Sequence, residues 1–372
     1  MEYRTYGKTG KQVSLLSFGA MRLPQDDDEA VAIMKRALDL GVNLIDTALA
    51  YGDGRSERLV GRAVKGRRDQ VYLSTKNPLQ DDTAAGWRRR LEQSLSNLDV
   101  DYIDFYVLIH DVRLEKFNTS FRNPGQGLEE ALKAREEGLI RHFTFSSHDS
   151  PENIRTLIDT ELFEGIIVQY NLLDRRNEEV IAYAHERGLG VQIMGPVGGG
   201  RLGMRSERLE GVVSGACSTA EIALRFVMAN PNVTTVMSGM STMQQVEENC
   251  ATANEAGPLT EEERAAVVEL LEQNKELARL YCTGCAYCMP CPQGVGIPQC
   301  FEAMIYHKVW GLTQLARRRY RGIQHGRVTW QEQVVKAADA CIECGQCEEK
   351  CPQNIPIIEQ LKETHSALAS DD

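Results

Sequence analysis

Residues 42–76 read VNLIDTALAYGDGRSERLVGRAVKGRRDQVYLSTK, with a short apolar run at each end and a segment of helical apolar spacing between them. Short β-rich runs that alternate with helical patterns indicate βα units and a parallel sheet. The pattern recurs along the chain and gives strand candidates at residues 13–18, 42–45, 71–75, 103–109, 140–145, 165–168, 190–193 and 233–237. Eight such units in roughly 250 residues predict an α/β fold of the (β/α)8, or TIM, barrel class.

A doubly wound open sheet is the main alternative, because it is built from the same units. Its first strand is typically followed by a G-x-G-x-x-G motif, and no such motif follows residues 13–18. Residues 103–109, IDFYVLI, form an apolar run without alternation, as in strands that are covered on both faces. The barrel is therefore the predicted fold.

Charge and hydropathy restrict the classes of function. The chain of 372 residues carries a net charge of −11, which argues against a nucleic-acid-binding surface, since phosphate contacts need clustered Lys and Arg. The first residues contain no apolar core of a signal peptide, and no stretch approaches 18 uninterrupted apolar residues. We expect a cytoplasmic protein with no membrane span and no nucleic-acid partner.

Cysteine usage indicates a second domain. None of the eleven cysteines lies in the first 216 residues, and eight of them form two regular motifs between Cys282 and Cys351. Because the cytosol keeps thiols reduced, metal binding explains this pattern better than disulfides do. Thr260 and Glu263 match the capping box that opens a helix. The predicted organisation is a barrel over residues 1–257, a connecting helix over residues 258–280 and a metal-binding domain over residues 281–366.

Polar residues follow three consecutive strand candidates of the barrel. Asp46 ends the second candidate, Lys76 the third and His110 the fourth, and Tyr51 stands on the loop after Asp46. Active sites of these barrels are built at the C-terminal ends of the strands, so we expect the four side chains on one rim. Singly, a lysine, aspartate or histidine at a strand end is usually a salt-bridged or structural residue.

Together, the four side chains suit the reduction of a carbonyl group. A nearby ammonium lowers the pKa of a phenol, and Lys76 is placed to act on Tyr51 in this way. Asp46 would keep the lysine charged and oriented, and His110 would donate a hydrogen bond to the substrate oxygen or assist proton transfer. Tyr51 would then deliver the proton.

The segments NLIDTALAYGDGRSERLVGRA, VYLSTK and YIDFYVLIH resemble successive motifs of the aldo-keto reductase family. The resemblance covers residues 1 to about 257. It implies a catalytic tetrad of Asp46, Tyr51, Lys76 and His110, with Tyr51 as the proton donor. It also implies that NAD(P)H binds across the rim without a Rossmann fingerprint, and that the substrate is a small-molecule carbonyl or alcohol.

The same resemblance implies a set of cofactor-binding positions. They are Gly19, Ala20 and Met21 beside the nicotinamide, Ser146 and Gln169 at its carboxamide, Met194 where the family often has a stacking tyrosine, Gly239 and Gln245 where NADP-specific members often have a lysine and an arginine, and Asn249 beside the adenine. Without those two cations the choice between NADP and NAD stays open. Residues 198–200, all glycine, are interpreted either as backbone close to the pyrophosphate, with Arg201 or Arg205 adding charge, or as a plain flexible loop.

The cysteine motifs indicate iron–sulfur clusters. They are Cys282-x2-Cys285-x2-Cys288-x2-Cys291-Pro and Cys341-x2-Cys344-x2-Cys347-x3-Cys351-Pro. The second has the spacing of the bacterial ferredoxin run, in which three thiolates hold one cubane and the fourth ligates the other. Crossed ligation would give Cys282, Cys285, Cys288 and Cys351 to one [4Fe–4S] cluster, and Cys341, Cys344, Cys347 and Cys291 to the second.

Zinc is the alternative metal, because C-x2-C pairs also build zinc ribbons. Two sets of four cysteines at near-regular spacing, each followed by proline, favour iron–sulfur clusters. The region resembles the small, mainly helical dicluster ferredoxin-type domain that is attached to some reductases.

The role of the clusters is left open by the sequence. A nicotinamide transfers a hydride, whereas each cluster passes single electrons, so direct exchange between them needs an intermediary such as a flavin. The clusters exchange electrons with a redox partner protein, feed a bound flavin, or support the structure. A cluster-dependent electron-transfer reductase is therefore the alternative function, and a non-catalytic nucleotide-sensing barrel is the third.

Overall fold

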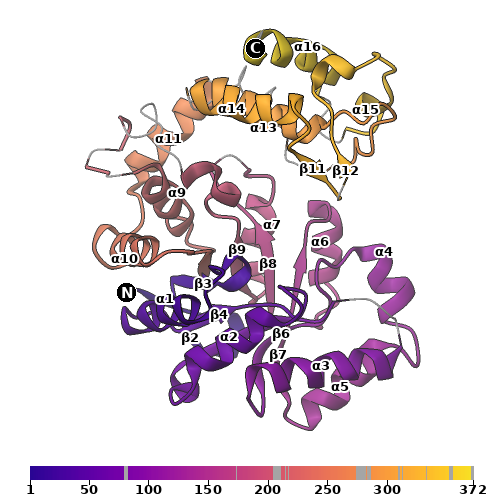
Figure 1. Ribbon diagram of the computed structural model, residues 1–372. Coiled ribbons are helices and arrows are strands. Elements are labelled where there is room, and N and C mark those ends of the chain that lie inside the picture. The colour runs from indigo at the N-terminus through magenta and orange to yellow at the C-terminus, as the bar shows by residue number, and fades with distance from the viewer. Residues whose placement is uncertain are drawn as a thin grey trace. The chain divides into compact units, whose positions relative to one another are not determined.

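The computed structural model describes residues 1–78, 83–172, 174–203, 211–213, 215–216, 218–273, 282, 286–308, 311, 313–331, 333–351 and 355–369. The chain divides into two compact units (Figure 1). The first comprises Met1–Gly203 and Ala220–Arg264, and the second Met204–Thr219 and Ala265–Asp372. The domain boundaries after residues 257 and 280 stay predictions.

A closed barrel of eight parallel strands forms the centre of the first unit (Figure 1). The strands follow one another around the barrel in the order β10, β3, β4, β5, β6, β7, β8 and β9. Their bounds are Leu16–Gly19 (β3), Leu44–Asp46 (β4), Tyr72–Lys76 (β5), Ile103–Val107 (β6), Ile140–Ser147 (β7), Gly165–Gln169 (β8), Gly190–Met194 (β9) and Thr235–Ser238 (β10). The predicted (β/α)8 fold is confirmed.

Helices connect the strands and cover the outside of the barrel. They are α1 (Asp27–Asp39), α2 (Arg55–Val64), α3 (Ala84–Leu98), α4 (Leu114–Lys116), α5 (Gly127–Glu136), α6 (Pro151–Ile158), α7 (Glu178–Glu186), α9 (Thr219–Met228) and α10 (Met243–Ala251). The first shows why the sequence folds in this way: Asp26 accepts a hydrogen bond from the Glu29 backbone N–H, and Ala30, Ile33 and Ala37 bury one face.

The predicted capping box opens α11 (Glu261–Gln273). Thr260 Oγ1 accepts a hydrogen bond from the backbone N–H of Glu263, with an N to O distance of 3.2 Å. In return, Glu263 Oε2 accepts one from the backbone N–H of Thr260 at 2.8 Å. Residues 274–280, the end of the predicted connecting helix, lie outside the described residues.

Protein side chains fill the N-terminal end of the barrel. Tyr6 follows β1 (Tyr3–Thr5), is fully buried, and stacks on Phe105 with 4.1 Å between ring centroids. Gly165 and Gly190 begin β8 and β9, and a Cβ atom at either would lie 2.2 Å from a Tyr6 atom. Glycine is required there because Tyr6 occupies the space. The candidate catalytic residues lie at the opposite end.

The apolar run at residues 13–18 corrects the strand prediction. It holds parts of two strands: β2 (Gln12–Ser14), which pairs with β1 in an antiparallel hairpin, and the barrel strand β3, which begins at Leu16. Val13, Leu15 and Leu16 are all fully buried. A continuous apolar pattern therefore hides the point where the chain leaves the hairpin and enters the barrel.

The second unit is mainly helical in its described part. It contains α13 (Ile297–Lys308), α14 (Thr313–Gln324), α15 (Gln346–Glu349) and α16 (Ile357–Leu368), with a short hairpin of β11 (Thr329–Trp330) and β12 (Gln333–Val334). Phe301, Met304, Tyr320 and Leu361 are buried where α13, α14 and α16 pack together. Among the described residues of the whole chain, no helix has the length and apolar character that crossing a membrane requires.

Candidate active site and thiol pocket

Asp46 and Lys76 form a buried ion pair at the C-terminal ends of β4 and β5. Lys76 Nζ donates to Asp46 Oδ1 and, at 2.7 Å, to the Thr47 carbonyl. Ser74 Oγ donates to the other Asp46 oxygen at 2.7 Å. Lys76 is 3% exposed and Asp46 4% exposed, so solvent hardly screens the pair. The protein alone fixes the position of the ammonium group.

Tyr51 and His110 complete the group of four. Lys76 Nζ lies 5.2 Å from the centroid of the Tyr51 ring. The Tyr51 and His110 rings meet edge to face, with 5.8 Å between centroids and an interplanar angle of 77°. The backbone N–H of His110 donates to the Asn77 carbonyl at 2.9 Å, which fixes the segment after β6. The four predicted residues thus form a continuous series of contacts from Asp46 through Lys76 and Tyr51 to His110.

Burial controls the protonation of these groups. Burial raises the pKa of the Tyr51 phenol, and the neighbouring Lys76 ammonium offsets only part of that effect. The expected net lowering of this pKa is therefore wrong, because loss of solvation outweighs the ammonium. Burial acts to lower the pKa of Lys76, but Asp46 and Tyr51 outweigh it and the pKa is raised. Tyr51 is protonated and Lys76 charged at neutral pH.

His110 is uncharged at neutral pH. Burial, followed by the charge of Lys76, lowers its pKa to about 4. A neutral imidazole has one N–H donor and one acceptor nitrogen. His110 is therefore suited to hydrogen bonding of an oxygen atom, and a cationic role for it is disfavoured.

Two of the predicted carboxamide-binding residues lie near the C-terminal ends of neighbouring strands. Ser146 is in β7, and its Oγ accepts a hydrogen bond from the Asp111 backbone N–H at 2.9 Å. Gln169 ends β8, and its Nε2 donates to Asp174 Oδ2 at 3.0 Å. Met194 ends β9 and packs against a buried cluster of Val107, Ile167 and Met237. The structure places these three on adjacent strands.

Gly19 and Gly239 lie next to each other at the ends of β3 and β10. A Cβ atom at Gly19 would be 3.6 Å from the Gly239 nitrogen, so the two glycines keep this part of the rim clear of side chains. Ala20 is buried, whereas Met21 is 64% exposed, an unusual exposure for a large apolar side chain. The three predicted residues after β3 thus present one exposed apolar side chain at the rim.

Gln245 and Asn249 both lie on α10; Gln245 contacts the segment that connects β10 to α10, and Asn249 contacts the end of β10. Gln245 Oε1 accepts a hydrogen bond from the Ser241 backbone N–H at 2.7 Å. Asn249 Nδ2 donates to Ser238 Oγ at 3.1 Å. The structure therefore groups both predicted residues with Gly239 on one side of the rim.

Arg22 is a further charged residue on this rim that the sequence motifs do not single out. Its Nη1 donates to the Gly199 carbonyl at 2.7 Å, and its own carbonyl accepts from Ser241 Oγ at 2.6 Å. Gly199 belongs to the glycine run, whose φ angles of 58°, 69° and 96° suit glycine. Arg22 thus joins the glycine run to the β10–α10 segment. Its position directly after Gly19-Ala20-Met21 was the available sequence signal.

Arg201 and Arg205 are the two arginines that the sequence suggested for the glycine loop. The side chain of Arg201 and all of Arg205 lie outside the described residues. Arg22 is therefore the positive charge that the structure assigns to this part of the rim.

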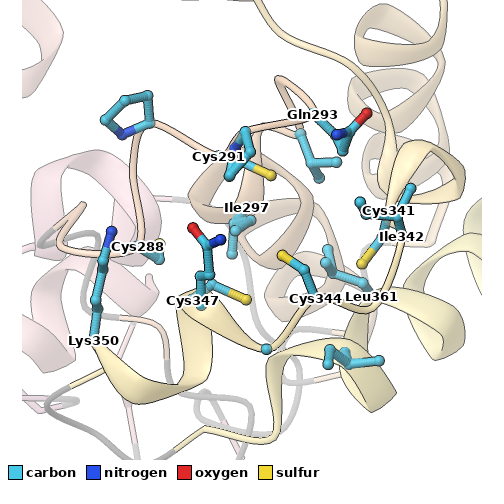
Figure 2. Close-up of a pocket in the computed structure, with 16 residues that line it drawn as sticks. Cys288, Cys291, Gln293, Ile297, Cys341, Ile342, Cys344, Cys347, Lys350 and Leu361 are labelled. Atoms are coloured by element: carbon cyan, nitrogen blue, oxygen red, sulfur yellow. The ribbon is translucent and has the colours of Figure 1, made fainter.

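Thiols from both cysteine motifs line one pocket of the second unit (Figure 2). The lining includes Cys291, Cys341, Cys344 and Cys347, which are the four residues of the second predicted cluster, together with Cys288. The empty volume is about 430 Å³, part of it open to solvent. Residues 50 positions apart in the sequence are thus brought to one cavity, as crossed ligation requires.

The spread of these thiols fits a cluster better than a single ion. A zinc ion holds its sulfur ligands at about 2.3 Å, so a zinc site draws them to one point. The thiols surround a space instead, and thiolates are the ligands of iron–sulfur cubanes.

The first predicted cluster is only partly described. Cys282 and Cys351 are outside the pocket lining, and Cys285 lies outside the described residues. Cys250 and Cys300 belong to neither motif and are fully buried, as free cysteines that act as small apolar side chains usually are. None of the nine cysteines that the structure describes forms a disulfide.

Comparison with known proteins identifies the barrel. Residues 15–216 and 212–272 match the model of the aldo/keto reductase family. The chain belongs to the aldo/keto reductase family. Residues 281–355 of this reductase match the model of the 4Fe-4S dicluster domain, which confirms the predicted pairing of a reductase barrel with a C-terminal iron–sulfur domain.

Several relatives resemble about three quarters of this chain. An uncharacterized oxidoreductase of Bacillus subtilis, YqkF, is 30% identical over 308 residues that span 74% of this chain and 98% of the relative. L-galactose dehydrogenase of Arabidopsis thaliana is 27% identical over 313 residues, 74% of this chain and 96% of the relative.

Solved structures agree with this assignment. The holo form of an aldo-keto reductase from Bacillus halodurans has a TM-score of 0.65 and 32% identity, over 73% of this chain and 96% of that one. An aldo-keto reductase from Klebsiella pneumoniae in complex with NADPH has a TM-score of 0.63 and 26% identity, over 73% and 95%. About a quarter of this reductase lies outside each match.

Proposed function

We propose that this aldo/keto reductase uses NAD(P)H to reduce a carbonyl group of a small molecule, or to oxidise the corresponding alcohol, with Tyr51 as the proton donor. The observation that carries the proposal is the series of contacts from the buried Asp46–Lys76 pair to Tyr51 and His110. The NADPH complex of the relative from Klebsiella pneumoniae supports the choice of cofactor.

The protonation states of the four residues suit this chemistry. Tyr51 holds its proton at neutral pH, because burial raises the pKa of the phenol, and it can give that proton to a substrate oxygen. Lys76 stays charged through Asp46 and stabilises the negative charge left on Tyr51. His110 is neutral and can orient the same oxygen by a hydrogen bond. When bound, the reduced nicotinamide supplies the hydride.

The rim fits a nicotinamide nucleotide. Gly19 and Gly239 leave room for a ligand between the ends of β3 and β10. Ser146 and Gln169 offer hydrogen-bonding groups on the neighbouring strands, which suit a carboxamide. Arg22 supplies a cation beside the glycine run, where we propose that it contacts the pyrophosphate. The chain's own residues thus match both ends of such a ligand.

We also propose that the second unit holds two [4Fe–4S] clusters by crossed ligation. The shared pocket of Cys291, Cys341, Cys344 and Cys347 supports this arrangement for the second cluster. When bound, the clusters pass single electrons. This pocket also favours a second candidate function, an electron-transfer reductase, which predicts turnover with a chemical reductant and none with NAD(P)H.

Replacement of the proton donor tests the main proposal. In Tyr51→Phe, the phenyl ring keeps its contacts but the hydroxyl is gone, so kcat for the best carbonyl substrate should fall by about 100-fold or more. NAD(P)H affinity, measured by fluorescence titration, should change little. Tyr183→Phe is the matched control, because Tyr183 donates its hydrogen bond to Asp159 on the outer helices. Turnover of Tyr51→Phe within about threefold of the unchanged protein would refute the role of Tyr51.

A further inference from the structure

Gln169 is fixed by an ion pair beneath it. Asp174 is 6% exposed, and its Oδ2 accepts the hydrogen bond from Gln169 Nε2 at 3.0 Å. Arg176 donates to both oxygens of the same carboxylate, with Nε 2.8 Å from Oδ1 and Nη2 2.9 Å from Oδ2. A two-pronged contact of this kind fixes the carboxylate in orientation as well as in position.

The ion pair determines which way the Gln169 amide faces. An ionised carboxylate only accepts hydrogen bonds, so the amide must turn its NH2 group toward Asp174. Its carbonyl oxygen, Oε1, then points the other way. A Cβ atom placed on Gly195, just after β9, would lie 3.9 Å from Oε1, so glycine at this position leaves the oxygen uncovered on that side.

Hydrogen bonds with Asn171 fix the position of Asp174. Its backbone N–H donates to the Asn171 carbonyl at 3.2 Å and to Asn171 Oδ1 at 3.0 Å, and the Asn171 N–H returns a bond to the Asp174 carbonyl at 3.1 Å. Asn171 Nδ2 donates to the Gly195 carbonyl and Asn177 Nδ2 to the Gln169 carbonyl, at 2.9 and 3.0 Å. The orientation of Gln169 is therefore built into buried loop structure.

We propose that Asp174 and Arg176 are positioning residues that make Gln169 present a hydrogen-bond acceptor, so that the barrel mouth selects a ligand with an N–H group there. The inference rests on the proposed function, in which that ligand group is the primary carboxamide of nicotinamide. A free glutamine amide can rotate and offer either its C=O or its NH2 group. The ion pair removes the second choice, and a ring whose carboxamide is replaced by an acetyl group lacks the required donor.

A ratio of two affinities tests the proposal. The unchanged protein should bind the nicotinamide dinucleotide about tenfold more tightly than its 3-acetylpyridine analogue, because the analogue leaves the acceptor unpaired. In Asp174→Asn the Gln169 amide can rotate and present its NH2 group instead, so the ratio of the two affinities should fall to about one. Affinity for ADP-ribose, which lacks the ring, should stay within about twofold. Isothermal titration of all three ligands gives these values.

Two further variants separate positioning from folding. In Arg176→Met the Asp174 carboxylate remains but loses the arginine that fixes it. The ratio of the two affinities should therefore lie between those of the unchanged protein and Asp174→Asn. The Arg176 side chain is 37% exposed, so its loss is better tolerated than a change in the core. Arg187→Gln is the control, because it removes an arginine that pairs with Glu161 on the surface. It should keep the original ratio.

The outcomes are distinct. An unchanged ratio in Asp174→Asn, or an equal loss of affinity for all three ligands, would show that the ion pair only holds the loop and would overturn the inference. If the unchanged protein binds ADP-ribose and both dinucleotides but does not discriminate between the two dinucleotides, the inference fails and the proposed cofactor stands. If the unchanged protein binds none of the three, the proposed function itself is overturned, and the inference with it.

Discussion

The barrel mouth and the thiol pocket are assembled in opposite ways. At the mouth, Lys76 and Asp46 are 3% and 4% exposed, and protein groups satisfy them. In the pocket, Cys344 is exposed, and the neighbouring helix α15 has only four residues. Protein contacts hold the barrel site in place by themselves, whereas we infer that the cysteine-rich unit is organised around the clusters that it would bind.

Backbone strain occurs between the cysteines of both motifs in the second unit. Ala286 and Glu343 lie between cysteines of the two motifs and have φ angles of 60° and 59°. Residues other than glycine rarely adopt such angles, at a cost on the order of 1 kcal/mol each. Near Glu343, the four-residue helix α15 buries no side chain and offers little packing to offset that cost. Bonds between thiolates and a metal cluster are the stabilising interaction that the sequence provides.

The largest expected effect comes from removing the metal. Metal–thiolate bonds contribute on the order of 10 kcal/mol to the folding of small metal-binding domains. Treatment with a chelator and an oxidant under argon should therefore make residues 282–369 sensitive to limited proteolysis, while the barrel resists cleavage and keeps its NAD(P)H affinity within about threefold. Protease resistance that survives complete loss of iron would show that the second unit holds itself together, and would break the contrast.

The same contrast separates what the sequence predicts well from what it predicts poorly. Asp46, Lys76 and His110 could be placed on one rim from sequence alone, because each ends or follows an apolar run and parallel strands bring their C-terminal ends together. The pKa of Tyr51 could not be predicted, since the competing effect of burial depends on packing around the phenol. Spacing identifies the location of charged groups but not their solvation.

The residues that position other side chains could not be predicted from the sequence either. Arg22 bonds Gly199 in another loop, and Asp174, held by Arg176, bonds Gln169 within the loop that follows β8. The spacing of the sequence does not reveal the folded path that makes either contact. In the sequence these residues are ordinary charges in polar segments. In the thiol pocket the opposite is true. The spacing of the cysteine motifs predicts the candidate metal ligands, but it does not predict the path of the chain between them.

A medium-sized effect concerns the pH dependence of the barrel mouth. The pKa of His110 is about 4 in the folded protein and about 6.5 in an unfolded chain. As pH falls from 7 the unfolded state takes up the proton first, so stability is lost between about pH 6.5 and pH 4. The difference between the two pKa values corresponds to about 3 kcal/mol.

His110→Asn should therefore lose less stability than the unchanged protein between pH 7 and pH 4.5, as measured by urea unfolding of the barrel at each pH. His185→Asn, on the outside of α7, is the control and should keep the original pH dependence. If the unfolding free energies of His110→Asn and the unchanged protein depend on pH in the same way, His110 is solvated in the folded protein. The barrel mouth would then be open to solvent, as the thiol pocket is at Cys344, and the contrast between the two sites would fail.

The smallest effect concerns a difference within the barrel itself, between the buried Asp46–Lys76 pair and the exposed Arg22 side of the rim, where we propose that the cofactor phosphates bind. Arg22 bonds the Gly199 carbonyl, so Arg22→Gln should weaken NADH and NADPH binding alike, by about tenfold at low salt, since both carry the pyrophosphate. Because Arg22 is exposed, the difference between the variant and the unchanged protein should shrink as salt is added. Arg62→Gln, which loses a surface pair with Asp28, should bind both nucleotides normally. Weakening confined to NADPH would instead place Arg22 at the 2′-phosphate and give this rim the cation that Gly239 and Gln245 do not supply.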